Sequence, residues 1–250
     1  MKSAAKVAPV GMALGAVVIL AAWVSFSPVP AVAQGTQGQN AVYNSSGNCS
    51  PSSPCLGSSA FIDASVFGNP NTTTFCSVIY GILRPVSYST SVIDARGLNS
   101  TNTKMTCASG TSPWNNGSNY VNKPSVILLP AGTIYTSASW VLPANTKLIG
   151  TAKGSGSIGT TNYAFETAIQ ASASFSGAVV QFGNSTFCPS GCQGISVEHL
   201  TISGAGYTMN GIENDNCGLQ CYVEHVTLYE VLGTGLKVGG SYATDSGPYC

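Results

Sequence analysis

Charged side chains are scarce in this sequence: they make up 7% of its 250 residues, with 9 Lys and Arg, 9 Asp and Glu and 2 His. No cluster of basic residues is present to neutralise phosphates, which argues against nucleic acid or an anionic membrane surface as a partner. The low charge does not indicate disorder, because 44% of the residues are hydrophobic. Together with 29 Gly residues, this composition predicts a β-rich protein with many short strands and turns.

Long apolar runs are also lacking, except at the N-terminus. Val10–Phe26 is a mostly apolar run of 17 residues, preceded by Lys2 and Lys6 and followed by the small-x-small site Ala31–Ala33. This pattern predicts a secretory signal over residues 1–33. The alternative, an uncleaved anchor, needs a span of about 20 apolar residues. Cleavage leaves 7 basic and 9 acidic residues, and no second run predicts membrane contact. We therefore expect a secreted protein.

All nine cysteines follow the predicted signal. An oxidising compartment makes disulfides the default, and we expect no metal site. An alternative is a zinc site built from two Cys-x3-Cys segments, since four thiolates at such spacing can hold the metal. The predicted pairs are Cys49–Cys55, Cys188–Cys192, Cys217–Cys221 and, as a fourth, Cys76–Cys107; Cys250 is left without a partner.

The mature chain divides into two parts. Residues 34–71 are rich in Gly, Ser and Asn and predict a flexible linker, and residues 72–250 hold the folded part. Within it, apolar residues recur at helical spacing over Phe75–Leu83, after the potential N-caps Thr72–Thr74. Short strands bounded by Pro, Gly and Asn are predicted at residues 90–97, 125–129, 133–135, 140–142 and 147–150. Strands this short suit the coils of a solenoid better than a sandwich.

A repeat supports the solenoid. Val197–Ile202 recurs as Val223–Leu228 after 26 residues, and Gly211–Glu213 recurs as Gly235–Lys237 after 24 residues. We predict that the first two segments are in-register neighbouring strands of one parallel sheet, with Val197, Leu200 or Ile202 and their equivalents in the core.

The repeat is still running at Gly235–Gly240, and no capping segment follows. A stacked fold needs a polar cap at each end, so we expect this chain to be the N-terminal portion of a longer solenoid. The alternative is a short protein whose tail covers its last coil.

Two segments carry a family resemblance. Val126–Tyr135 and Trp140–Gly150 resemble the opening coil of the pectate-lyase-like superfamily, including domains related to family 28 glycoside hydrolases. The resemblance implies an all-β right-handed parallel β-helix, a solenoid with a short N-terminal capping α-helix, and carbohydrate as the usual ligand. The helix at Phe75–Leu83 is the candidate cap.

The catalytic segments of the family 28 hydrolases are missing. Neither Asn-Thr-Asp, Asp-Asp, Gly-His-Gly nor Arg-Ile-Lys occurs, and Asn214-Asp215-Asn216 is the nearest approach to the first. Calcium is implied only by the family resemblance, because no Asp cluster is dense enough to supply several carboxylate ligands. No other cofactor is indicated.

The candidate binding residues are Glu213, Asp215 and Lys237. The repeat stacks Glu213 on Lys237, and Asp215 lies two residues on, on the same face of a strand. This group could bind sugar hydroxyls or assist a base; the alternatives are a surface ion pair and a solvated acidic turn.

A second candidate is the pair of Glu-His dipeptides. Glu198-His199 and Glu224-His225 occupy equivalent repeat positions. They could form an acid–base pair, but an outward polar ladder is the interpretation we favour.

Three functions fit these observations. The first is a polysaccharide lyase or glycoside hydrolase that acts on an acidic or plant-type glycan. The second is a non-catalytic adhesin that binds glycans with the same solenoid face. The third is a structural surface solenoid, since a fold alone does not determine function.

Overall fold

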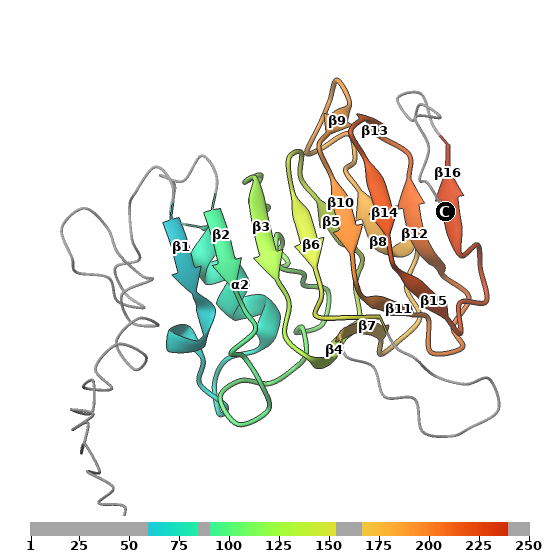
Figure 1. The fold of residues 1–250 in the computed structure, drawn as a ribbon. Helices are drawn as coiled ribbons and strands as arrows, with labels where there is room; N and C mark the ends of the chain where they lie inside the picture. The colour runs from blue at the N-terminus through green and yellow to red at the C-terminus, as the bar shows by residue number, and fades with distance from the viewer. Residues whose placement is uncertain (1–59, 85–90, 154–166, 240–250) are drawn as a thin grey trace, which may run out of the picture.

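The computed structural model describes residues 60–84, 91–153 and 167–239 (Figure 1). Within these ranges the chain forms parallel β-sheets and a single α-helix, so the fold class is all-β. None of the described helices is long and apolar enough to cross a membrane. The predicted signal and the cysteines Cys49, Cys55 and Cys250 lie outside the described residues.

Three sheets form the body of the molecule, and every strand pair in them is parallel. The first has the order β1 (Ala60–Asp63), β2 (Ser91–Asp94), β3 (Ser125–Leu128), β6 (Lys147–Ile149), β10 (Ser196–Glu198), β14 (Tyr222–Glu224). The second is β4 (Gly132–Thr136), β7 (Thr167–Ala171), β11 (Thr201–Ser203), β15 (Thr227–Tyr229). The third is β5 (Trp140–Leu142), β8 (Ala178–Phe182), β12 (Asn210–Asn214), β16 (Leu236–Val238). A small fourth sheet pairs β9 (Cys192–Gln193) with β13 (Cys217–Leu219).

The chain visits the three main sheets in rotation. One pass runs through β10, β11 and β12, and the next runs through β14, β15 and β16. The register matches the repeat, since Val197 faces Val223 and Ile212 faces Leu236. The predicted in-register parallel pairing of the repeated segments is therefore confirmed.

The prediction that Val197–Ile202 forms a strand of one sheet is wrong. The segment contributes to two sheets, because β10 ends at Glu198 and β11 begins at Thr201. His199 forms the corner with a φ of 54°, and His225 repeats it with 51°. A left-handed residue breaks the extended backbone and redirects the chain into the next sheet.

The core consists of side chains that stack in register from pass to pass. Strand alternation turns every second residue inward, and neighbouring strands lie about 4.8 Å apart. The three inward columns are Ile62, Ile93, Ile127, Leu148, Val197 and Val223; Ile134, Ile169, Ile202 and Leu228; and Trp140, Val180, Ile212 and Leu236. All are buried except the last member of each column, which is partly exposed or exposed.

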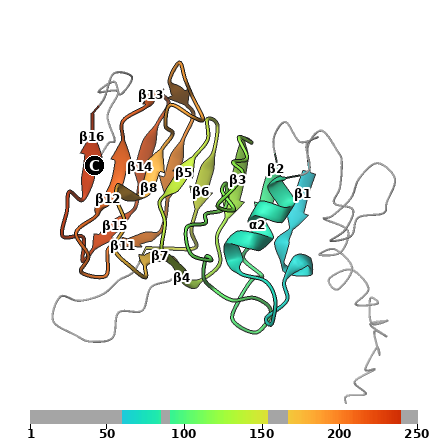
Figure 2. The ribbon, with the colours of Figure 1, turned by 180° about the vertical axis from the view of Figure 1, so that it is seen from behind.

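Helix α2 (Phe75–Leu83) covers the N-terminal end of this core. The first sheet begins with β1 and β2, which have no described counterparts in the other two sheets, and α2 lies against them in their place (Figures 1 and 2). Phe75 stacks on Trp140 with ring centroids 5.9 Å apart. Thr74 closes a capping box with Ser77, whose backbone N–H donates to Thr74 Oγ1 at 3.2 Å. The predicted helix and its N-cap are confirmed.

The predicted linker is too long at its C-terminal end. Strand β1 and the short 3₁₀ helix η1 (Ala64–Phe67) both fall within residues 34–71. Ile62 belongs to the first inward column, and the Asp63 carboxylate accepts the backbone N–H of Ser65 at 2.9 Å. A four-residue strand is too short for its periodicity to stand out from a Gly- and Ser-rich context.

Three disulfides tie loops to this framework. Their Cα separations are 4.9 Å for Cys76–Cys107, 5.2 Å for Cys188–Cys192 and 6.1 Å for Cys217–Cys221, all within bridging range. They are three of the four predicted pairs. The four thiols of the alternative zinc site are therefore consumed in two local disulfides.

Candidate functional site

The outward face of the third sheet holds the predicted binding residues. Val141, Gln181, Glu213 and Lys237 face one another across β5, β8, β12 and β16. They alternate with the inward column of Trp140, so they form one outward column, which we call the outer column. Its members change from apolar to polar to charged along the sheet.

Glu213, Asp215 and Lys237 meet at the end of the outer column, and we call them the acidic cluster. The Lys237 ammonium donates a hydrogen bond to Glu213 Oε1 and lies 3.6 Å from Asp215 Oδ2. Asn210, on the same strand as Glu213, donates from Nδ2 to Glu213 Oε2 at 3.3 Å. The Glu213 side chain is only 9% exposed, against 37% for Asp215 and 45% for Lys237. The structure thus brings all three predicted residues together.

The two carboxyl groups of the acidic cluster differ in proton affinity. Burial pushes the pKa of Glu213 upward, but hydrogen bonds from Asp215, Lys237 and Asn210 outweigh it and lower the pKa. Burial and the neighbouring Glu213 carboxylate raise the pKa of Asp215. Glu213 therefore stays ionised to lower pH than Asp215 does.

This geometry favours binding over glycosidic cleavage. Two-carboxyl glycosidases keep their carboxyl groups at least about 5 Å apart, with the scissile bond between them. Here a single Lys237 ammonium contacts both Glu213 and Asp215 and occupies the space between them. A lysine that abstracts protons needs a lowered pKa, but the hydrogen bond to Glu213 raises the pKa of Lys237. What the cluster offers is a set of fixed charged donors and acceptors, partly open to solvent.

The cluster does not fit the calcium that the family resemblance implies. Calcium takes six to eight oxygen ligands. Here the Lys237 ammonium already contacts both carboxyl groups, and one of them is biased toward its protonated form. Among the described residues, no group of three or more His, Cys, Asp or Glu side chains is placed to hold a metal ion.

The Glu-His dipeptides form a ladder on the first sheet. Glu198 faces Glu224, and the rings of His199 and His225 stack with centroids 4.8 Å apart and planes 12° from parallel. Glu198 Oε1 accepts hydrogen bonds from Ser196 Oγ and Tyr222 OH, each at 2.7 Å. These contacts agree with the ladder interpretation rather than with an acid–base pair.

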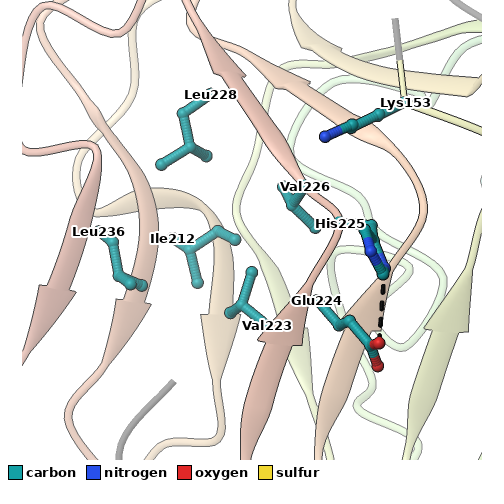
Figure 3. Close-up of a pocket in the computed structure, with 8 residues that line it drawn as sticks. All are labelled: Lys153, Ile212, Val223, Glu224, His225, Val226, Leu228 and Leu236. Atoms are coloured by element: carbon teal, nitrogen blue, oxygen red, sulfur yellow. Dashed lines mark ion pairs between the residues drawn. The ribbon is translucent and has the colours of Figure 1, made fainter. Parts of the chain in front are cut away.

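A hollow with a volume of about 530 Å³ lies at the last described pass (Figure 3). Its apolar side chains include Val223, Leu228 and Leu236, the last members of the three inward columns, which converge on one side in Figure 3. On the other side, His225 Nδ1 lies 3.4 Å from Glu224 Oε1. Among the described residues, the lining of the hollow therefore consists mainly of core-type apolar side chains rather than of the polar groups of a ligand site.

A smaller hollow was not indicated by the sequence. It has a volume of about 190 Å³ and adjoins Val141, the first member of the outer column. Tyr120 and Phe187 line it, and both come from loops without regular periodicity. The sequence between the predicted strands at 90–97 and 125–129 shows no periodicity, so it does not indicate which side chains this loop presents.

Comparison with known proteins gives no match: no protein-family model fits the sequence, and no curated protein or solved structure is similar to it. The resemblance of Val126–Tyr135 and Trp140–Gly150 to the pectate-lyase-like superfamily stays a hypothesis, and any function has to be argued from the geometry of the outer column and its surroundings.

Proposed function

We propose that the three sheets form a right-handed parallel β-helix capped at its N-terminal end by α2. The rotation of the chain through the sheets and the parallel register of successive passes support it. The right hand follows from the strong preference of parallel β crossovers for that hand. Each pass then covers the core of the pass before it.

We further propose that this is an exported glycan-binding protein, whose outer column is the binding face. The convergence of Glu213, Asp215 and Lys237 beside the uncharged Gln181 is the observation that carries this proposal. Sugar hydroxyls both donate and accept, and the column offers an ionised acceptor, an ammonium donor and an amide in fixed register. Three disulfides and the predicted signal support export.

A second candidate function is cleavage of an acidic or plant-type polysaccharide, as a lyase or hydrolase. The opposite directions of the Glu213 and Asp215 pKa shifts favour it, because such pairs often divide acid and base roles. In this candidate, Asp215 would supply a proton and Glu213 would remain ionised beside it.

The test compares binding and turnover on the same oxidised, purified full-length protein. Electrophoresis through gels that contain a neutral β-glucan, a galactan or polygalacturonate measures binding, and unsaturated product and reducing ends measure cleavage. We expect retardation without turnover, and a loss of about tenfold in affinity for Glu213→Gln, since a charge-assisted hydrogen bond is lost.

Glu230→Gln is the matched control, because Glu230 is exposed on a turn and its carboxylate accepts the Tyr229 hydroxyl at 2.8 Å. Turnover by the native protein that is lost in the Asp215→Asn variant would favour cleavage, the second candidate, over binding without cleavage. Equal affinities for Glu213→Gln and Glu230→Gln would refute the binding role of the cluster.

A further inference from the structure

The smaller hollow beside Val141 has the composition of a sugar subsite. Its lining holds no charged side chain: it is formed by Ser112, Asn115, Tyr120, Ala138, Ser139, Val141, Asn184 and Phe187. Its volume of about 190 Å³ is below the range of pockets for drug-sized ligands, so it suits a single ring.

Tyr120 provides an aromatic surface at this hollow. It is 55% exposed, yet its ring lies edge-on against Phe187 with centroids 5.6 Å apart and planes at 82°. Phe187 is buried and is held by Asn122, whose Nδ2 donates to the Phe187 carbonyl at 2.8 Å. Because the buried Phe187 already restrains the exposed Tyr120 ring, a ligand that stacks on this ring immobilises little additional side-chain freedom on binding.

Unused hydrogen-bonding groups lie around this aromatic surface. The amide oxygens of Asn115 and Asn184 accept backbone N–H groups, at 2.7 Å from Gly117 and 2.9 Å from Phe187. Their Nδ2 donors have no partner among the described residues. Ser139 Oγ is shielded from solvent and likewise has no partner within the described ranges. Shielded polar atoms of this kind are normally hydrogen-bonded.

The loop that presents Tyr120 is anchored before any ligand arrives. Trp114 is fully buried and packs edge-on against Trp140, with ring centroids 6.4 Å apart. The backbone N–H of Val121 donates to the Trp114 carbonyl at 2.9 Å, and Cys107 at the start of the loop is tied to Cys76. The hollow is therefore preorganised.

The hollow is continuous with the outer column. Val141 lines the hollow and begins the column that continues through Gln181 to Glu213 and Lys237. Two strand steps of about 4.8 Å separate Val141 from Glu213 and a third reaches Lys237, so the acidic cluster lies about 10–14 Å along the column from Val141. A glycan chain that lies along the column would therefore place one sugar in the hollow and another at the cluster.

We propose that the hollow is a subsite for an uncharged pyranose, stacked on Tyr120 and hydrogen-bonded by Ser139 and Asn184. The inference rests on the proposed glycan-binding function and narrows it. The ligand is a neutral glycan, or one with an uncharged sugar at this position, and not a homopolymer of uronate. A carboxylate in this hollow would meet no cationic side chain.

The test measures the affinity of the full-length protein for a neutral β-glucan, a galactan and polygalacturonate by gel retardation. We expect binding to at least one neutral polymer and a loss of tenfold or more for Tyr120→Ala, while Tyr120→Phe keeps the stacking and most of the affinity. Tyr207→Ala is the matched control, since Tyr207 is an exposed tyrosine (36%) outside the hollow.

The outcomes separate this inference from the proposed function. Retardation by polygalacturonate alone, sensitive to Glu213→Gln but not to Tyr120→Ala, overturns the neutral subsite and leaves the binding face in place. Retardation by none of the polymers overturns both. Ser139→Ala adds an independent check, because it keeps the loop and its aromatic pair intact and should weaken neutral-glycan binding by several-fold.

Discussion

Replacing Ile202 with alanine tests whether each pass of the chain covers the one before it. Ile202 is fully buried in the second inward column, between Ile169 on β7 and Leu228 on β15. Leu228 occupies the same column one pass later and is 36% exposed. The two residues therefore occupy equivalent positions in successive passes but differ in solvent exposure.

The expected losses differ by more than a factor of two. Removing three buried carbons costs about 2.4 kcal/mol in transfer free energy. At Ile202 the surrounding columns enclose the gap, and the cavity brings the loss to about 4 kcal/mol. At Leu228 about a third of the side chain already meets solvent and no closed cavity forms, so the loss for Leu228→Ala is about 1.5 kcal/mol.

Urea unfolding followed by far-UV circular dichroism measures both values on the oxidised protein, provided that the m-values stay equal. Thermal midpoints supply a second reading, with about 2–4 °C per kcal/mol for a chain of this size. A loss for Leu228→Ala equal to that for Ile202→Ala would refute the reasoning, because the last described pass would then be covered as fully as the one before it. No measurable loss at Ile202 would refute the stacked column itself.

Two further predictions concern covalent and electrostatic stability. Replacing both cysteines of Cys76–Cys107 by serine should lower the free energy of unfolding by about 3.7 kcal/mol, and replacing those of Cys188–Cys192 should lower it by about 2 kcal/mol. The difference arises because the two pairs are separated by 31 and 4 residues, and a longer loop loses more chain entropy on closure. Urea unfolding of both variants measures the two losses, and a larger loss for Cys188–Cys192 would contradict the prediction. The raised pKa of Asp215 means that its contribution to stability is present at acidic pH and is lost as pH rises through that pKa. The free energy of unfolding of Asp215→Asn should therefore rise relative to that of the native chain as the pH increases from about 3 to about 7. A difference between the two proteins that stays constant over this interval would rule out the raised pKa of Asp215.

The register of the fold could be predicted from the sequence because the repeat fixes it. The 26-residue displacement between Val197 and Val223 corresponds to one pass of the chain, and the two residues pair across neighbouring strands. A slip of this pairing by one residue would turn the apolar side chains outward. The same repeat register correctly predicted that Glu213 and Lys237 lie opposite each other on neighbouring strands. Local helix signals were equally sufficient at Thr74 and Ser77, where the capping box depends only on neighbours in sequence.

Corners and loops could not be predicted in this way. His199 adopts a left-handed conformation that glycine or asparagine would signal but histidine does not, so the division of its segment between two sheets was missed. Trp114 and Tyr120 belong to a loop without periodicity, and only tertiary contacts decide that the first is buried and the second exposed. The smaller hollow therefore had no signature in the sequence.

The two faces of the third sheet differ in how they vary from pass to pass. Its inward column stays apolar, with Val180 and Ile212 in its centre, because each side chain must fill the same cross-section above the last. The outer column is free of this packing constraint, and its side chains change from Val141 through Gln181 to the ion pair of Glu213 and Lys237. A face that served only solubility would gain nothing from burying a carboxylate to 9% exposure beside a second carboxyl, because desolvation opposes it. Under the proposed glycan-binding function, the graded outer column would offer an uncharged ring contact at one end and charged hydrogen bonds at the other.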